Sequence, residues 1–423
     1  MAEIKIYNAN QIGGNFTVIT SNETKIIIDY GQALPGSKEE QEAFDWENDT
    51  VDAVFFTHYH GDHVGRILEI PKHIPLYMGG TARQIMLNIH RALSRVEELR
   101  EEQMKYIEIL EDDKRIHELR EGKPCKKIGD IEVIPYSVDH SAYDAYMFLI
   151  KTADEHILHT GDFREHGYRG SKILDVIEKL VLPRAKGCID TLIIEGTMME
   201  RKGEHVRREK DLKAEAAERF KENRHVFLVC SSTNLDTLAS FHKAALENDM
   251  YTYCYSKYLL GQLETFTKTA GAHTDLYKFD KTYLVELDKE FHHKYWCEPK
   301  TQEKIMREKG FLCMIKPGEK YAEWIERFAD LKPLVVYALW DGYLDSSRDA
   351  YNAEWAEFFE PYKKSGQFLE LHTSGHATPE TIAKVIEAVK PRKRIYPMHT
   401  GKAEEFRALP IKDEYKEKLY FQK

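Results

Sequence analysis

The chain of 423 residues is too long for one ordinary hydrophobic core, so two domains are expected. Hydrophobic residues make up 42% of the chain and charged residues 31%, which is typical of a soluble globular protein, and no apolar run is long enough to cross a membrane. The formal net charge of −10 disfavours a broad basic face for nucleic acid, but it allows a site where metal ions and a few Lys or Arg neutralise phosphates locally.

Strands are predicted throughout the N-terminal region. Two β-branched runs, 16–19 and 25–29, are separated by polar turn residues, and the second ends on Asp29. The next predicted strand, 52–57, leads directly into His58-Tyr59-His60-Gly61-Asp62-His63. Three imidazoles and a carboxylate so close together are difficult to satisfy without a cation. This segment therefore predicts a metal site at the end of a buried strand.

Residues 81–120 lack Pro and Gly and carry apolar residues at three-to-four spacing, so one or two amphipathic helices are predicted there. Further strands are predicted at 131–138, 146–150, 156–159 and 191–194. The strands end close to His140, Asp162 and Glu195. Acidic residues and histidines at successive strand ends predict a site assembled along one edge of packed sheets.

Strands and helices alternate from about residue 201 onwards. Helices are predicted at 201–223, 235–247, 257–269, 301–309, 319–330 and 349–363, with strands at 226–230 and 335–339. This alternation predicts a second α/β domain with a parallel sheet. Site-like residues then return at 371–376, before a predicted helix at 378–390, and again at Pro397-Met398-His399.

The six cysteines are scattered without a C-x-x-C pair, and the first residues lack the apolar core of a signal peptide. The cysteine pattern argues against a disulfide framework and against a Cys-type zinc site. Both observations favour a cytoplasmic protein in a reducing environment.

The His-rich segment supplies ligands for two cations. His58 and His60 occupy alternate positions and can share one cation, whereas Asp62 and His63 can reach a second. His140 and Asp162 are further candidate ligands because each follows a predicted strand, and His399 is the candidate to complete the second site. A two-metal site needs a bridging carboxylate, for which we take Asp162, and a bridging hydroxide, which serves as the nucleophile.

The order Asp29, His58-x-His60-x-Asp62-His63, His140, His159-Thr160-Gly161-Asp162 resembles the metallo-β-lactamase superfamily. Glu195 after a strand, Thr373-Ser374-Gly375-His376-Ala377 and Pro397-Met398-His399 resemble three motifs of its β-CASP family, which processes nucleic acids. Ribonuclease J-type nucleases are the most similar members. The resemblance covers residues 10–200 and 370–405, and one departure is Gly196, where the family usually carries Ser.

The resemblance implies an α/β fold, namely an αββα sandwich with an inserted α/β β-CASP domain. It places the first part of the sandwich at 1–200, the insertion at 201–370 and the return to the sandwich at 371–423. The long stretch between Asp162 and His399 leaves room for this insertion.

The resemblance also implies roles for individual residues. One zinc ion is held by His58, His60 and His140, a second by Asp62, His63 and His399, and Asp162 is shared. Asp29 orients the histidines. His376 donates a proton to the leaving oxygen or stabilises charge on the phosphate, and Glu195 holds His376 and raises its basicity. Thr373 and Ser374 contact a phosphate. Manganese or iron can replace zinc, because His and Asp ligands discriminate weakly.

The expected function is that of a binuclear zinc phosphodiesterase acting on single-stranded RNA, with exo- or endonuclease mode, end requirement and homo-oligomerisation left open. Three alternatives remain: a hydrolase of a small ester, thioester or lactone, a DNA nuclease, and a catalytically silent nucleic-acid-binding subunit. His159 is expected to be a partly buried strand residue rather than a ligand. Four other histidines are expected on surfaces or in loops, namely His205, His292, His293 and His372.

Overall fold

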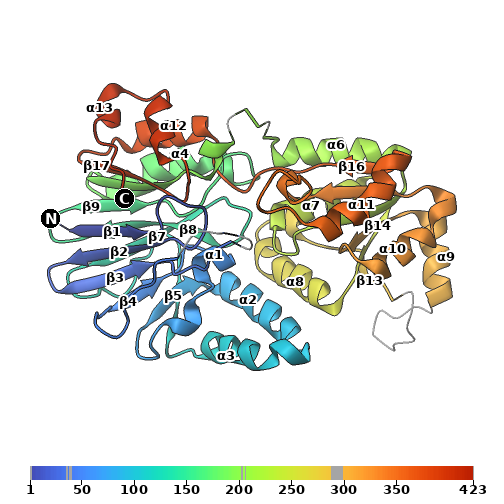
Figure 1. Cartoon of the computed structure of the whole chain (residues 1–423), viewed down its shortest axis with the longest axis horizontal. Coiled ribbons are helices and arrows are strands. Elements are labelled where there is room, and N and C mark those ends of the chain that lie inside the picture. The colour runs from blue at the N-terminus through green and yellow to red at the C-terminus, as the bar shows by residue number, and fades with distance from the viewer. Residues whose placement is uncertain are drawn as a thin grey trace. The chain divides into compact units, whose positions relative to one another are not determined.

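A computed structural model describes residues 2–34, 37, 41–201, 203–204, 206–286 and 299–422 (Figure 1). The chain forms two compact units: Met1–His205 together with Gly375–Lys423, and Val206–Ser374. Thr373 and Ser374, which were expected in the returning part of the first domain, therefore belong to the inserted unit. The expectations for His205, His292 and His293 fall outside the described residues.

The first sheet of the first unit has six strands in the order β1-β2-β3-β4-β5-β6. These strands are β1 (Glu3–Tyr7), β2 (Phe16–Ser21), β3 (Thr24–Ile28), β4 (Ala53–Phe55), β5 (Leu76–Gly79) and β6 (Ile116–Leu119). β1, β2 and β3 are antiparallel, whereas β3 to β6 are parallel. Because β4 is central, the segment that follows it begins inside the domain.

The second sheet has five strands in the order β17-β10-β9-β8-β7. These strands are β7 (Glu132–Val138), β8 (Ala145–Lys151), β9 (His156–His159), β10 (Thr191–Glu195) and β17 (Arg394–Met398). β9, β10 and β17 are parallel neighbours, although β17 comes about 200 residues after β10 in the chain. In the sequence, the inserted unit therefore falls between two strands that are neighbours in the sheet.

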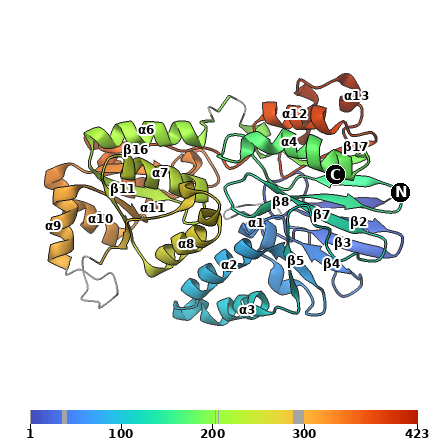
Figure 2. The same ribbon diagram turned by 180° about the vertical axis from the view of Figure 1, so that it is seen from behind.

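The two sheets pack face to face. Alternate side chains such as Ile26 and Ile28 from the first sheet meet Phe148 and Ile150 from the second in one buried cluster. Helices cover the outer faces: α2 (Gly80–Leu93) and α3 (Arg100–Glu111) beside the first sheet, and α4 (Ile173–Val176) and α12 (Pro379–Val389) beside the second (Figures 1 and 2). This arrangement is the predicted αββα sandwich.

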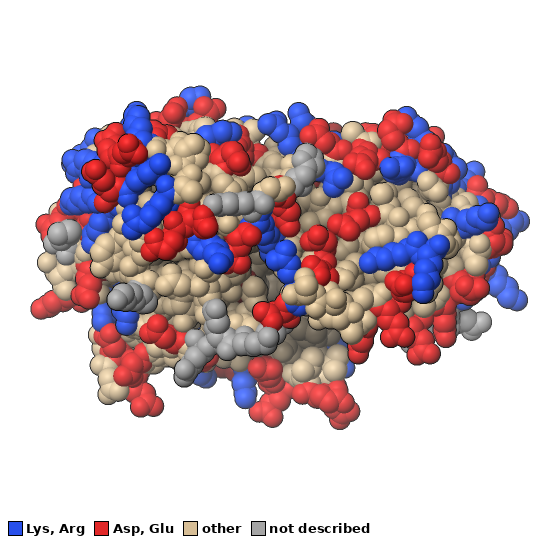
Figure 3. Space-filling view, turned by 45° about the horizontal axis from the view of Figure 1, so that its top comes forward, with Lys and Arg blue, Asp and Glu red and all other residues tan. Residues whose placement is uncertain are grey.

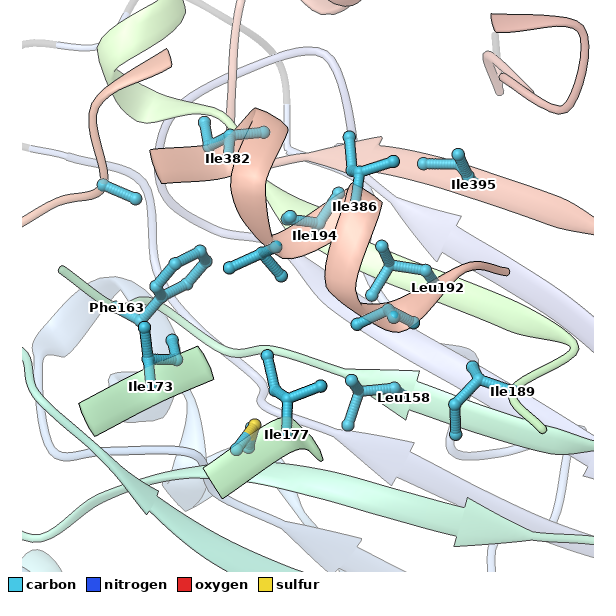
Figure 4. Close-up of a cluster of buried hydrophobic side chains, with 14 of the residues drawn as sticks. Leu158, Phe163, Ile173, Ile177, Ile189, Leu192, Ile194, Ile382, Ile386 and Ile395 are labelled. Atoms are coloured by element: carbon cyan, nitrogen blue, oxygen red, sulfur yellow. The ribbon is translucent and has the colours of Figure 1, made fainter. Parts of the chain in front are cut away.

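The outer face of the second sheet is closed by a dry apolar layer (Figure 4). Leu158 and Leu192 from the strands pack with Ile177 from the helical segment and with Ile382 and Ile386 from α12, all without exposed surface. Each such side chain contributes about 1.5–3 kcal/mol of burial free energy. This layer fixes the sheet whose strand ends carry several of the predicted site residues.

The inserted unit contains a parallel sheet of six strands in the order β13-β12-β14-β11-β15-β16, as the alternating pattern predicts. Its strands are β11 (His225–Cys230), β12 (Tyr251–Cys254), β13 (Thr282–Leu284), β14 (Phe311–Ile315), β15 (Leu334–Ala338) and β16 (Phe368–Glu370). Its helices are α6 (Glu209–Glu222), α7 (Leu235–Glu247), α8 (Lys257–Lys268), α9 (Pro299–Lys309), α10 (Glu319–Glu326) and α11 (Ala353–Ser365). Of the described helices in either unit, none has the length and apolar character needed to cross a lipid bilayer.

Two predicted elements differ from the structure. Residues 116–119, predicted as helix, form the edge strand β6, because pairing with β5 buries Ile116 and Leu119. The charged helix predicted at 201–223 begins only at Glu209. Gly203 has a φ of +88°, which is incompatible with a right-handed helix, so the helix cannot run through this residue. In both places tertiary pairing or local backbone conformation overrides propensity.

Candidate metal centre

Strand ends deliver the predicted ligands to one place in the first unit. His58 and His60 follow β4, and Asp62 and His63 lie on the short helix α1 (Gly61–Val64) directly after them. Three further predicted ligands follow β7, β9 and β17, namely His140, Asp162 and His399. Because β9, β10 and β17 are parallel and in register, the residues that follow their carboxyl ends meet at one edge of the sheet.

The first group of possible metal ligands consists of His58, His60 and His140. The Nε2 atom of His58 lies 3.1 Å from Nδ1 of His60, and Nε2 of His140 lies 3.2 Å from the same atom. His58 and His140 are buried, and His60 is half-buried. Three imidazole nitrogens therefore converge on one point, as three ligands of a tetrahedral site do.

The second group consists of Asp62, His63 and His399. The Nε2 atom of His399 lies 3.2 Å from Oδ2 of Asp62, and Nε2 of His63 lies 3.9 Å from it. Asp162 connects the two groups: its Oδ2 atom is 3.1 Å from His63 Nε2, and it also forms a possible metal group with His58 and His63. The donor atoms of each group lie within 4.8 Å of one another.

The outer ring nitrogens of two predicted ligand histidines, His140 and His63, lie next to oxygen acceptors. His140 Nδ1 lies 2.7 Å from the carbonyl oxygen of Gly375, and His63 Nδ1 lies 2.9 Å from the carboxylate of Asp29. These oxygens accept, so each Nδ1 carries the proton and each Nε2 presents its lone pair to the centre. Such outer partners fix the tautomer that metal ligation requires.

Two threonine hydroxyls hold the outer nitrogens of the remaining buried histidines. Thr57 donates to Asp29 (2.8 Å), so its oxygen accepts from His58 Nδ1 at 3.0 Å. Thr197 Oγ1 lies 2.9 Å from Nδ1 of His399. Sequence reasoning did not identify either hydroxyl, although Thr57 directly precedes the His cluster and Thr197 follows Glu195 by two residues.

Burial and charge give the two groups different electrostatics. Burial lowers the pKa values of His58 and His140 well below the ordinary range, and neighbouring imidazoles lower them further. Burial also lowers the pKa of His60, to about 4. Burial acts to lower the pKa of His63 as well, but three neighbouring carboxylates, that of Asp162 foremost, outweigh it and raise this pKa. The first group thus offers neutral lone pairs, and the second favours added positive charge.

The residues present fit a divalent cation. Asp162 is almost completely buried, and its Oδ1 atom has no hydrogen-bond partner among the described residues; the same holds for Nε2 of His63. A buried carboxylate oxygen without a donor costs free energy unless a cation or a proton satisfies it. A donor set of imidazoles and carboxylates suits zinc, manganese or iron.

Glu195 and His376 form a pair beside this centre. Nδ1 of His376 lies 3.3 Å from Oε2 of the completely buried Glu195 and 3.6 Å from Oδ2 of Asp162. Glu195 Oε1 accepts backbone hydrogen bonds from Phe163 (3.1 Å) and Ala377 (3.2 Å). Burial acts to lower the pKa of His376, but the Glu195 carboxylate outweighs it and raises this pKa. His376 is thereby held as a potential proton donor next to the metal groups.

A buried ion pair that the sequence did not indicate supports two of the loops. Arg164 Nε donates to Asp139 at 2.9 Å, and both side chains are fully buried. Asp139 directly precedes His140, and Arg164 follows Asp162 by two residues. Neither position carries a local signal, because only the fold brings the loops together.

Four other predicted positions lie elsewhere. Thr373 and Ser374 belong to the inserted unit, where Thr373 donates to the backbone oxygen of Arg207. His159, expected to be partly buried, is almost completely buried at the end of β9, and its Nε2 atom lies 3.2 Å from Thr17 Oγ1. His372 is half-buried in a loop of the inserted unit.

Comparisons with known proteins place this geometry in context. Residues 9–176 match the model of the metallo-beta-lactamase superfamily. Ribonuclease J of Mycobacterium tuberculosis, from strains CDC 1551 / Oshkosh and ATCC 25618 / H37Rv, is 29% identical over 166 residues. That match covers 37% of this chain and 26% of the relative. A crystal structure of a protein of unknown function from Enterococcus faecalis V583 matches with a TM-score of 0.67 and 19% identity over 96% of each chain, a likeness of fold alone.

Proposed function

We propose that this chain, which contains a metallo-β-lactamase superfamily domain, is a metal-dependent hydrolase that cleaves the phosphodiester backbone of RNA. The observation that carries the proposal is the Glu195–His376 pair, which lies within 3.6 Å of Asp162, the carboxylate that connects the two metal groups. A hydrolase needs an activated water, a charged clamp for the substrate and a proton for the leaving group. The candidate centre has residues suited to each task.

In this proposal His58, His60 and His140 hold one cation, Asp62, His63 and His399 hold the other, and Asp162 is shared between them. When bound, two divalent cations would neutralise a phosphodiester and make water acidic enough to attack it near neutral pH. Asp29, which accepts from Thr57 and lies 2.9 Å from His63 Nδ1, keeps the lone pair of His63 directed inward.

His376 acts on the leaving group in this proposal. Its raised pKa favours the protonated imidazole, which can donate a proton to the departing oxygen or stabilise charge on the phosphate. Glu195 accepts from Phe163 and Ala377, and these bonds fix the carboxylate against the ring. His376 also forms a possible metal group with His140 and Asp162, but it is not one of the proposed ligands. Removing the ring should therefore lower the rate and leave the proposed metal ligands in place.

The choice of RNA rests on the partial similarity to ribonuclease J and on the inserted α/β unit, which we interpret as a β-CASP domain. On the face drawn in Figure 3, Lys and Arg side chains alternate with Asp and Glu side chains. The grip on a phosphate chain is accordingly proposed to be local, with metal ions and a few basic residues carrying the attraction. Single-stranded RNA in the cytoplasm is the proposed partner, and Thr373 and Ser374 are proposed phosphate contacts.

The test incubates the purified chain with end-labelled single-stranded RNA and DNA that carry 5′-phosphate or 5′-hydroxyl ends. Wild type should cleave RNA, and His376→Ala should cleave it at least about 100-fold more slowly, the usual size of an acid–base contribution. His372→Ala is the matched control, since His372 lies in the inserted unit and in none of the metal groups. Turnover of thioesters or lactones, without cleavage of either nucleic acid, would refute the nuclease proposal and favour the small-ester alternative.

A further inference from the structure

His399 has an unusual backbone conformation for a proposed ligand. Its φ angle is +55°, in the left-handed region that non-glycine residues seldom adopt. The side chain has no exposed surface, and its Nε2 atom lies 3.2 Å from Asp62 Oδ2. A residue held in this region persists only where its surroundings enforce it, and such residues cluster at functional sites. The groups that contact His399 therefore determine how its ring is placed at the proposed metal centre.

One hydroxyl holds both ends of His399. Thr197 Oγ1 lies 2.9 Å from the ring Nδ1 and donates to the carbonyl oxygen of His399 at 3.3 Å. Because the hydroxyl proton is directed to the carbonyl, its oxygen is free to accept from an Nδ1–H group. Thr197 is almost completely buried, so the outer nitrogen of the ring is shielded from water that could replace this acceptor.

The strand pairing explains why these residues meet. β10 and β17 are parallel neighbours in which Glu195 lies opposite Met398. Thr197 and His399 follow these two residues and so leave the sheet at the same edge. Glu195 Oε2 also accepts from the backbone N–H of Thr197 at 3.2 Å, which fixes the start of the turn.

We propose that Thr197 is a positioning residue that sets the affinity of the second metal group, an inference that rests on the proposed metal centre. Its hydroxyl keeps the ring proton of His399 on Nδ1, so the lone pair on Nε2 faces Asp62 and an incoming cation. Without this acceptor the proton moves to Nε2 and forms a hydrogen bond to Asp62. That closed pair withholds two of the three ligands of the group from the cation.

The experiment compares Thr197→Val, which removes the hydroxyl and keeps the shape, with Thr197→Ser, which keeps the hydroxyl. Thr191→Val is the matched control: Thr191 is also buried, begins the strand that Thr197 follows and donates to Glu155 at 3.2 Å. Metal-free protein is titrated with Zn²⁺ against a chelator, and bound zinc is counted by elemental analysis. Thr197→Val should lower the affinity for the second cation about 10- to 100-fold and leave the affinity for the first unchanged. Thr197→Ser and Thr191→Val should bind both cations as the wild type does.

A spectroscopic reading separates positioning from a general loss of structure. In metal-free protein labelled with ¹⁵N-histidine, the ring ¹⁵N shifts of His399 should report a proton on Nδ1 in wild type and on Nε2 in Thr197→Val. A wild-type ring with its proton on Nε2, or unchanged zinc affinity in Thr197→Val, would overturn the inference, and so would a wild-type chain that takes up no second cation. Two tightly bound cations without RNA cleavage would overturn the proposed function and leave this inference standing.

Discussion

Replacing Asp29 by Asn should weaken metal binding although it changes no proposed ligand. Oδ1 of Asp29 accepts from the backbone N–H of Thr57 at 2.7 Å, and Oδ2 lies 2.9 Å from Nδ1 of His63. Asp29 has a φ of +61°, a conformation that Asn tolerates well, so the backbone should not move. The substitution therefore tests the charge and the acceptor alone.

The magnitude follows from the direction of the two hydrogen bonds. The amide of Asn must keep its oxygen towards Thr57 N–H, so its NH₂ group faces His63 Nδ1 and donates to it. The proton of His63 then moves to Nε2, the atom that lies 3.1 Å from Asp162 Oδ2 and faces the proposed cation. Loss of such an outer partner costs about 10- to 100-fold in affinity, or roughly 1.4–2.7 kcal/mol.

The assay is a zinc titration of metal-free protein against a chelator, with thermal unfolding to check that the variant is folded. Asp130→Asn is the matched control, because Asp130 also accepts side-chain hydrogen bonds, from Ser21 and Asn22, beside the turn that precedes β3. Asp29 follows the other end of β3, which puts roughly 15 Å between the two carboxylates. Wild-type zinc affinity in Asp29→Asn would refute the tautomer reasoning.

The remaining predictions concern the bridge, the core and pH. Asp162→Ala should lose most of the bound metal measured by elemental analysis, and full occupancy would contradict the shared role of Asp162. Leu158→Ala, in the fully buried layer of the second sheet, should lower the free energy of unfolding in urea by about 2–5 kcal/mol, and a loss under 1 kcal/mol would mean that the layer is looser than described. Burial lowers the pKa of His242 to about 3 in the folded chain, so the unfolded state takes up a proton first as pH falls below about 6.5. His242 should therefore lower the free energy of unfolding by about 3 kcal/mol between pH 7 and pH 4, and His242→Gln should reduce this loss. The same dependence of the unfolding free energy on pH in both proteins would contradict the prediction.

The sequence predicted the elements whose signal is local. The parallel sheet of the inserted unit and helices such as 235–247 follow from periodicity, whereas the αββα sandwich was implied by the family resemblance. The predicted ligands from His58 to His63 are close together in the chain, so their proximity needs no knowledge of the fold. His399 was a candidate for the second cation, but its position beside these residues could not be read from spacing, because it depends on the pairing of β10 with β17.

The parts that could not be predicted depend on tertiary contacts. Thr57 and Thr197 are ordinary threonines in the sequence, and they become acceptors only where the fold brings them to a ring nitrogen. The carbonyl oxygen of Gly375 has no side-chain signal at all. The sequence of residues 116–119 is typical of a charged helix, but pairing with the edge of β5 makes the segment a strand. Secondary-structure propensity depends on a single segment, whereas these hydrogen bonds and this strand depend on contacts between two segments.

Because β10 and β17 are far apart in the chain, the second sheet cannot be completed until long after β10 has been synthesised. At about 5–20 residues per second, roughly 10–40 s pass between the appearance of β10 and that of its neighbour. During that interval the apolar edge of β10 has no native partner on one side and is a target for wrong pairing. The first metal group is complete at His140, whereas the second waits for His399. We therefore expect the nascent protein to acquire the two proposed cations one after the other, which metal counting on ribosome-bound chains of increasing length can test.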